Sequence, residues 1–251
     1  TNGIYIASDG GINTLINSGT IEGVNTGIFT YQTSMDKFGN SGSIIASGGN
    51  SSGGVYMRNN KGGEKWKLSE FTNSGLIEIT SSNANSAGVY LAAGDLGTLI
   101  NNTDGKIHGK DNSAGMILSF IDSDALHADN ITNKGTITSD KSMGIKINNG
   151  VIIKTLSNEG IIQAGTNGVQ VTDTATYSSL NITLENFINT GTIIAGQDGI
   201  SIEDARKTAE TAIELKIGSI QNTGTIQAGR HGININDTQT KGQYSIGKID
   251  L

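Results

Sequence analysis

The stretch Asn189-Thr190-Gly191-Thr192-Ile193 recurs almost unchanged as Asn222-Thr223-Gly224-Thr225-Ile226, and six weaker copies precede these two. Successive copies of the asparagine lie 23 to 33 residues apart. Self-similarity at such a period is typical of a solenoid, in which each repeat forms one layer of an array. The repeat therefore predicts a stack of similar layers, here called rungs, over the whole chain.

The composition agrees with a stack rather than with a globular core. The 251 residues include 36 Gly, no Pro, no Cys and only 5% aromatic residues, which suits layers that need small corner residues and few large side chains. A formal charge of −6 argues against binding to nucleic acid or to an anionic membrane, since both require a basic surface. No apolar run is long enough to span a bilayer, so we expect no membrane insertion of this segment.

Three strand patterns follow one another in a fixed order within each repeat. In the first, a Gly is followed two residues later by Ile, as at Gly191 and Ile193, and Ile fills that position in all eight copies. In the second, a Gly precedes two apolar residues separated by one position, as in Gly199-Ile200-Ser201-Ile202. Such alternation after a Gly predicts a short strand that points its apolar side chains inward.

The third pattern combines two apolar residues three positions apart with an Asn two positions later, as in Leu184, Phe187 and Asn189. A spacing of three breaks the two-residue period of a strand, so we expect a bulge or a bend there. Eight such Asn, one per rung, predict a hydrogen-bonded ladder. Asn101 departs from the pattern, because two extra residues separate it from Gly105.

Three strands and three corners per repeat predict an all-β fold, a right-handed parallel β-helix with a triangular cross-section. About eight rungs give a rod about 40 Å long. Residues 1–251 would form a single β-helix segment, and we expect it to be a fragment of a longer solenoid. Insertions after the second strand should form a ridge along one edge of the rod, and 203–214 has a helix-compatible composition. The insertions span 59–67, 119–127, 172–183, 203–216 and 237–245.

The tandem Asn-x-Gly-x-Ile and Gly-Ile-x-Ile units, the lack of Cys and the many Gly, Ser, Thr and Asn resemble the passenger domain of a Gram-negative type V autotransporter. The resemblance is closest to the self-associating adhesin class and covers essentially the whole chain. It implies a bacterial cell-surface or secreted protein without enzymatic activity. It also implies aggregation or biofilm formation through contacts between passengers, with attachment to host glycans or matrix proteins as a further possibility.

An aromatic stripe occupies the outward position of the second strand in the N-terminal half of the chain. Aromatic side chains at equivalent positions of adjacent rungs stack about 5 Å apart. They would form either an exposed platform for a glycan or protein, or a stack covered by nearby insertions such as the one that contains Trp66. The candidate binding residues of this group are Tyr5, Phe29, Tyr56, Tyr90 and Trp66.

Short polar side chains occupy most outward positions of the first strand, among them Thr136, Thr192 and Thr225. A flat array of this kind can form many weak hydrogen bonds with an identical surface. It is equally consistent with a solvated face made of good strand formers. We regard these threonines as candidate contacts for self-association.

Enzymes that cleave polysaccharides also use a β-helix, and they need clustered carboxylates along one face. Two groups are candidates for such a cluster: Asp122, Asp124, His127 and Asp129 in one insertion, and Asp198 with Arg230 and His231. The first is more simply a polar loop and the second an ion pair between rungs. We therefore expect no catalytic residues, no metal and no cofactor, and keep a lyase or hydrolase, a passive stalk and a phage tailspike segment as alternatives.

Overall fold

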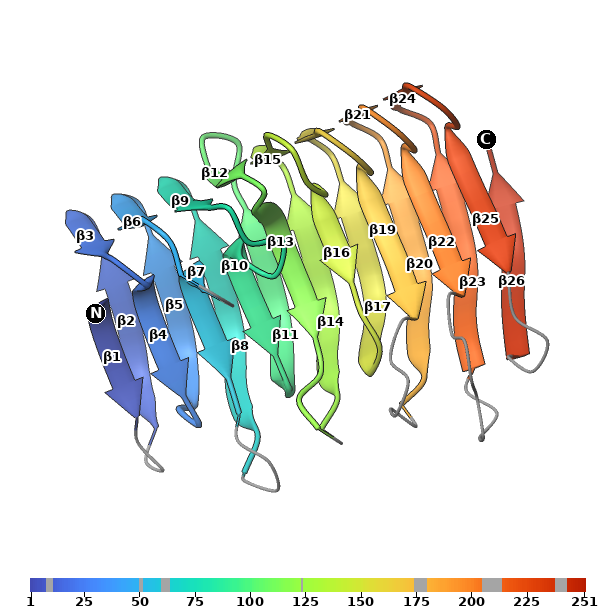
Figure 1. The fold of residues 1–251 in the computed structure, drawn as a ribbon. Coiled ribbons are helices and arrows are strands. Elements are labelled where there is room, and N and C mark those ends of the chain that lie inside the picture. Colours follow the sequence, from blue (N-terminus) through green and yellow to red (C-terminus); the bar gives the residue numbers. More distant parts are fainter. Residues whose placement is uncertain are drawn as a thin grey trace.

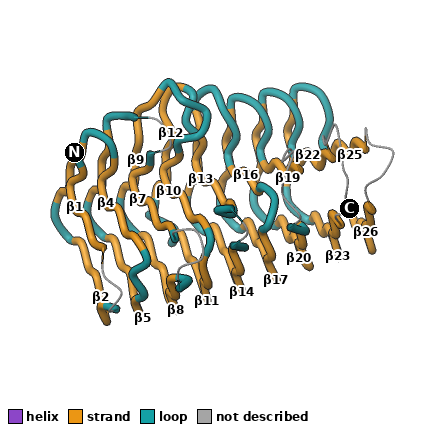
Figure 2. The backbone as a smooth tube through the Cα atoms, turned by 60° about the horizontal axis from the view of Figure 1, so that its bottom comes forward, coloured by secondary structure: helices purple, strands orange, loops and turns teal. Residues whose placement is uncertain are grey.

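The computed structural model describes residues 1–7, 11–49, 52–59, 64–122, 124–173, 180–204, 214–237 and 243–251. These residues form 26 strands and no helix, and none of them belongs to a helix that is long and apolar enough to cross a bilayer. The strands follow one another in a repeating order of three, and each joins one of three parallel sheets. The described part of the chain is therefore the three-sided parallel β-helix predicted from the repeats (Figures 1 and 2).

The second sequence pattern forms sheet A, which has nine strands. In spatial order these are β1 (Asn2–Ala7), β4 (Thr26–Tyr31), β7 (Gly53–Arg58), β10 (Ala87–Ala92), β13 (Ala114–Ser119), β16 (Ile145–Ile147), β19 (Val169–Asp173), β22 (Ile200–Asp204) and β25 (Ile233–Asp237).

The third pattern forms sheet B, which also has nine strands. These are β2 (Ile12–Asn17), β5 (Met35–Asn40), β8 (Trp66–Asn73), β11 (Gly94–Asn101), β14 (Leu126–Asn133), β17 (Val151–Asn158), β20 (Ile182–Asn189), β23 (Glu214–Asn222) and β26 (Gln243–Asp250).

The first pattern forms sheet C, which has eight strands. These are β3 (Thr20–Gly23), β6 (Ser43–Ala46), β9 (Leu76–Ser81), β12 (Lys106–Asp111), β15 (Thr136–Ser139), β18 (Ile161–Ala164), β21 (Thr192–Ala195) and β24 (Thr225–Ala228).

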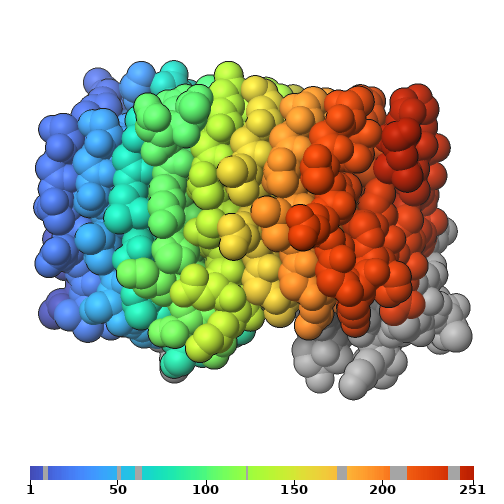
Figure 3. Space-filling model, turned by 90° about the horizontal axis from the view of Figure 1, so that it is seen from above, coloured from blue at the N-terminus to red at the C-terminus, as the bar shows by residue number. Residues whose placement is uncertain are grey.

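Each rung contacts mainly the rungs before and after it, so the colours of the chain follow one another as bands along the rod (Figure 3). The core is one column of aliphatic and aromatic side chains that runs through the coil. The recurring Ile packs its Cγ2 methyl where the glycine of a sheet A strand leaves room. A Cβ added to Gly168 would lie 2.4 Å from Cγ2 of Ile193, and one added to Gly199 would lie 2.2 Å from Cγ2 of Ile226. This contact explains why Gly and Ile recur together.

The asparagine ladder predicted for sheet B is present. In every step the Nδ2 of one Asn donates to the Oδ1 of the next, at 2.7 to 2.8 Å. Asn101 belongs to the ladder despite the two extra residues, because these form a separate turn in which the Gly105 N–H donates to the Asn102 carbonyl. The ladder satisfies side chains that are almost fully buried, namely Asn17, Asn40, Asn73, Asn101, Asn133, Asn158 and Asn189.

The strands of sheet B bend where the sequence predicts an irregularity. Pairing stays one to one on both sides, so no strand carries an extra residue, and the feature is a bend and not a bulge. One position between the inward residues lacks a pairing partner in every rung. It is occupied by Asn13, Asp36, Ser69, Gly97, Asp129, Lys154, Glu185, Gly218 and Gly247, which we call the bend column.

The insertions predicted to form a ridge all lie between a sheet A strand and the following sheet B strand, and so at one corner of the coil. The segment 119–126 is described except for residue 123, and it forms a tight turn closed by a bridge between Ile121 and Asp124. Most of 203–214, for which the composition suggests helical turns, lies outside the described residues.

Candidate functional site

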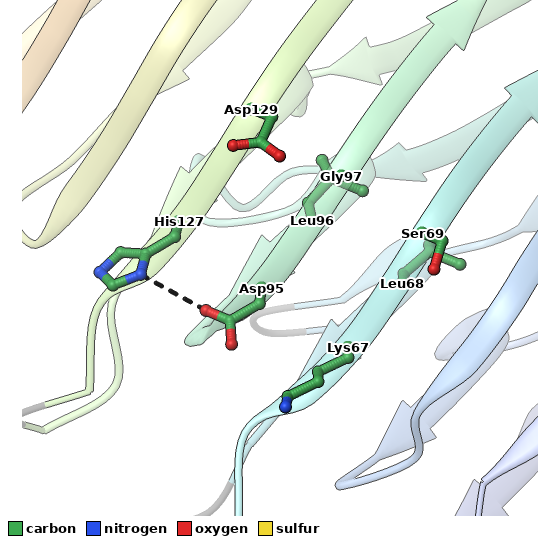
Figure 4. A pocket seen from close by; sticks show the side chains of 8 residues that line it. All are labelled: Lys67, Leu68, Ser69, Asp95, Leu96, Gly97, His127 and Asp129. Carbon is green, nitrogen blue, oxygen red and sulfur yellow. Dashed lines mark ion pairs between the residues drawn. The ribbon is translucent and has the colours of Figure 1, made fainter.

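A groove runs along the outer side of the bend in sheet B. One hollow of about 510 Å³ is lined by Lys67, Ser69, Asp95, Gly97, His127 and Asp129, with the backbones of Leu68 and Leu96 as its floor. Figure 4 shows Lys67, Asp95 and His127 side by side on three adjacent strands, with Ser69 and Asp129 farther along theirs. A second hollow of about 410 Å³ continues over β2 and β5 and shares Lys67 and Ser69 with the first.

The groove carries charges of both signs. The Asp95 carboxylate lies 3.4 Å from His127 Nδ1, and Asp129 pairs with Lys154 at 2.6 Å. That carboxylate raises the pKa of the exposed Lys154. Asp36, Asp95 and Asp129 outnumber the single lining lysine, Lys67, so the groove is mildly acidic and rich in hydrogen-bond acceptors.

The sequence singles out only His127 and Asp129 of this groove, as members of the acidic group. The residues of the groove come from five rungs and lie far apart in the chain, so no local motif marks them. They could be recognised only by their place in the repeat, because the polar lining residues lie in the bend column or two positions before it.

The aromatic stripe on sheet A stacks on itself instead of forming a platform. The Tyr5 and Phe29 rings are 5.5 Å apart at 24°, and the Tyr56 and Tyr90 rings are 4.6 Å apart at 19°. Phe29 meets Tyr56 edge to face at 5.3 Å. Because a sugar stacks on ring faces, and neighbouring rings already cover these, the stripe offers edges to a ligand. Tyr5 is 60% exposed, whereas Tyr56 is only 7% exposed.

Trp66 does not belong to any exposed surface, so its selection as a binding residue was wrong. The side chain is fully buried, and its Nε1 donates to the Ala92 carbonyl at 3.0 Å. The indole fits there because Gly94 of the next rung has no side chain; a Cβ at Gly94 would lie 2.1 Å from the ring. Trp66 therefore packs into the core and does not cover the aromatic stripe.

The candidate threonines lie on the outer face of sheet C as predicted. Thr192 and Thr225 are register partners, whereas Thr136 is followed by Ile161 in the next rung. The polar array is thus interrupted by aliphatic residues. In the N-terminal half of the sheet it is also interrupted by charged residues, at Glu22, Glu78 and Lys106.

A carboxylate-histidine-carboxylate cluster crosses three rungs of sheet C. His108 Nδ1 lies 3.1 Å from Glu78 and Nε2 lies 3.0 Å from Asp140. Each ring nitrogen is thus within hydrogen-bond distance of a carboxylate. Burial would raise the pKa of Glu78, but hydrogen bonds from Lys110 and His108 outweigh it and hold that pKa below its ordinary value. The hydrogen bond from His108 likewise lowers the pKa of Asp140.

Asp198 forms the predicted ion pair between rungs. Its fully buried carboxylate accepts from Arg230 at 2.6 Å, from the His231 ring at 2.9 Å and from Asn234 at 3.0 Å. Burial alone would raise the pKa of Asp198, but these hydrogen bonds bring it below its ordinary value. Because its oxygens are occupied by these bonds, Asp198 has a structural role and links two adjacent turns of the coil.

The other acidic group does not converge on one point. Asp124 accepts from Asn59 at 3.4 Å, His127 faces Asp95, and Asp129 faces Lys154. Asp122 is exposed, in a left-handed backbone conformation with φ of 54°. Among the described residues, no group of three or more His, Asp or Glu side chains is placed to hold a metal ion.

Comparison of the chain with protein-family models, with curated proteins and with solved structures finds no match.

Proposed function

We propose that this protein is a rod-shaped adhesin, presented at a bacterial cell surface, whose copies associate with one another through sheet C. The supporting observation is a flat, uncharged area over β15, β18, β21 and β24. Its outward side chains are Thr136, Thr138, Ile161, Gln163, Thr192, Ile194, Thr225 and Gln227.

This uncharged face combines the features that a contact between identical copies requires. Ile161 is 42% exposed and supplies apolar area, while the neighbouring Gln163 and Thr192 supply donors and acceptors. A two-fold contact brings the same patch of both copies together, so a patch without charge avoids repulsion between like groups. Because each contact is weak, the association is reversible and grows with the number of rungs that take part.

The test is the settling of non-aggregating bacteria that display the protein. Thr192→Lys places one charge in the middle of the uncharged face and should slow settling, because two-fold pairing then brings two ammonium groups close together or buries them. The matched control is Thr20→Lys, at the same position of the sheet in β3, two residues before Glu22 and outside the uncharged face. This variant should settle like the parent.

Equal amounts of displayed protein, measured by surface labelling, are required for the comparison. If the parent does not settle, the proposed self-association is wrong. If both lysine variants settle at the parental rate, another face of the coil is responsible.

A further inference from the structure

The groove on sheet B is a continuous channel parallel to the axis of the coil. Its two hollows share Lys67 and Ser69 and together cover β2, β5, β8, β11 and β14. Parallel strands lie about 4.8 Å apart, so five strands span about 19 Å. Each rung presents a polar side chain at one or both of the same two positions, with Gly11 and Gly97 as the exceptions, and the groove therefore matches a ligand that is itself linear and repetitive.

The floor of the groove is backbone, and its sides are formed by polar side chains. The side chains of Leu68 and Leu96 point into the core, with 1% and 3% exposure, so backbone forms the floor. Gly97, on the middle strand of the first hollow, has no side chain, and a Cβ there would lie 2.5 Å from the Ser69 carbonyl oxygen of the previous rung. A flat molecule can thus approach the backbone between Asp95 on one side and Asp129 on the next strand.

The lining groups favour hydroxyl groups as partners. Asp36, Asp95 and Asp129 accept hydrogen bonds, and Lys67 donates them, so the groove offers both acceptors and a donor. A sugar hydroxyl both donates and accepts. A uronate polymer instead would bring a row of carboxylates to three carboxylates, which Lys67 and the Lys154 paired with Asp129 do not outnumber, and this is unfavourable.

An extended peptide fits the channel less well. A peptide strand is usually held by the unpaired edge of a sheet and by apolar pockets for alternate side chains. Here β5, β8, β11 and β14 are paired on both sides, only β2 at the end of the sheet has an unpaired edge, and the lining side chains are mostly polar.

From these features we infer that the groove binds a linear, uncharged polysaccharide along the coil axis. The carboxylates of Asp36, Asp95 and Asp129 would accept from its hydroxyls, and Lys67 would donate to them. This function goes beyond self-association, since it uses sheet B and not the uncharged face of sheet C. Both can therefore operate in one rod.

Calorimetric titration of the purified protein tests the inference. The probes are hexamers and dimers of glucose, mannose, galactose and N-acetylglucosamine, with a hexamer of galacturonic acid for comparison. At least one neutral hexamer should bind, more tightly than its dimer and more tightly than the galacturonate hexamer, because it contacts several rungs. Lys67→Ala and Asp129→Ala should each weaken that binding about tenfold, as expected for the loss of one hydrogen bond to a charged group.

Two matched controls lie in the same columns of sheet B but outside the lining of both hollows. Lys216 shares the column of Lys67, and Glu185 shares the bend column with Asp129. Lys216→Ala and Glu185→Ala should leave the affinity within a factor of about two.

Three results would overturn the inference: no binding of any neutral hexamer, preferred binding of the galacturonate hexamer, or equal losses in the groove variants and their controls. Thr192→Lys separates this inference from self-association, because it should slow settling and leave the affinity for the hexamer unchanged.

Discussion

Each inner asparagine of the ladder forms side-chain hydrogen bonds with the rung before it and with the rung after it. Asn133 accepts from Asn101 Nδ2 at 2.8 Å and donates to Asn158 Oδ1 at 2.8 Å and to the Ile161 carbonyl at 3.0 Å. With 1% exposure, it has no access to water that would replace these partners. The unit that identifies the fold in the sequence is therefore a structural corner and not a binding motif.

Asn133→Ala should lower the free energy of unfolding by about 2 to 3 kcal/mol, since it leaves buried amide groups without partners. The control is Asn130→Ala, on the same strand but with an exposed side chain, which should change stability by less than about 0.5 kcal/mol. Urea titration followed by circular dichroism measures both. Equal effects of the two substitutions would show that the ladder does not stabilise the coil.

The glycine of the same unit is required because backbones of adjacent rungs approach closely. A Cβ at Gly191 would lie 2.2 Å from the Gly160 carbonyl oxygen, whereas one at Gly19 meets nothing within 4 Å. Gly191→Ala should therefore cost about 1 to 3 kcal/mol through strain, and Gly19→Ala much less. Thermal unfolding of the two variants gives the comparison, and a similar melting temperature for both would contradict the packing argument.

At the scale of strands and columns, the aromatic stripe provides a test at alkaline pH. Burial, together with the neighbouring Tyr90, raises the pKa of Tyr56 from 10.0 to about 12. A raised pKa in the folded state contributes stability that is present below pH 10 and is lost as pH rises toward about 12. The loss amounts to about 2 to 3 kcal/mol for Tyr56.

Tyr56→Phe should remove this part of the alkaline dependence, because Phe has no ionisable group. The measurement is the unfolding midpoint in urea at successive alkaline pH values. Tyr5→Phe is the control, since Tyr5 lies at the exposed end of the stripe. A parallel loss of stability in the parent and in Tyr56→Phe would refute the assignment.

The cluster around His108 predicts the opposite dependence at acidic pH. The pKa values of Glu78 and Asp140 lie below their ordinary values of 4.5 and 3.8, so these two carboxylates stabilise the fold at pH values above 4.5 and 3.8. This stabilisation is lost as pH falls through the lowered values of the folded state. The double variant Glu78→Gln/Asp140→Asn should be less stable near neutral pH and show a shallower acid limb in its thermal unfolding. An unchanged acid limb would show that the cluster does not contribute.

The sequence predicts the strands of this fold better than it predicts the surfaces. The alternation of Gly and Ile identifies sheets A and C, and the spacing of three identifies the bend in sheet B, because inward positions follow simple periods. Trp66 was misplaced because its burial depends on Gly94 of another rung. The contact between His108 and Glu78 was missed because the two residues are separated by 30 positions and become neighbours only through the register of the strands.

At the scale of the whole molecule, the three sides of the coil present different chemistry. Sheet A carries a self-stacked aromatic column, sheet B a polar channel, and sheet C an uncharged face toward the C-terminal half. Thr192 lies on the outer face of sheet C and Lys67 on sheet B, so each can be substituted without changing a residue of the other surface. This separation allows each proposed activity to be removed by itself.

The nearest-neighbour organisation of the rungs predicts a local response to damage. In Gly191→Ala, hydrogen exchange should accelerate most in β18, β21 and β24, which surround the strained carbonyl of Gly160. Strands β3 and β6 should keep the protection that they have in the parent. Uniform acceleration along the coil would instead indicate that all rungs unfold as one cooperative unit.

The asparagine ladder also gives the coil an electrical direction. Every amide from Asn17 to Asn189 donates toward the C-terminal end, so the seven bonds are aligned dipoles, each of which polarises the next. An amide in the middle of such a series is strengthened from both sides, whereas Asn17 is strengthened from one. Replacing Asn101 by Ala therefore removes two hydrogen bonds and divides the series into two shorter ones. The same replacement at Asn17 removes only the terminal bond, so the loss of stability depends on the position in the series.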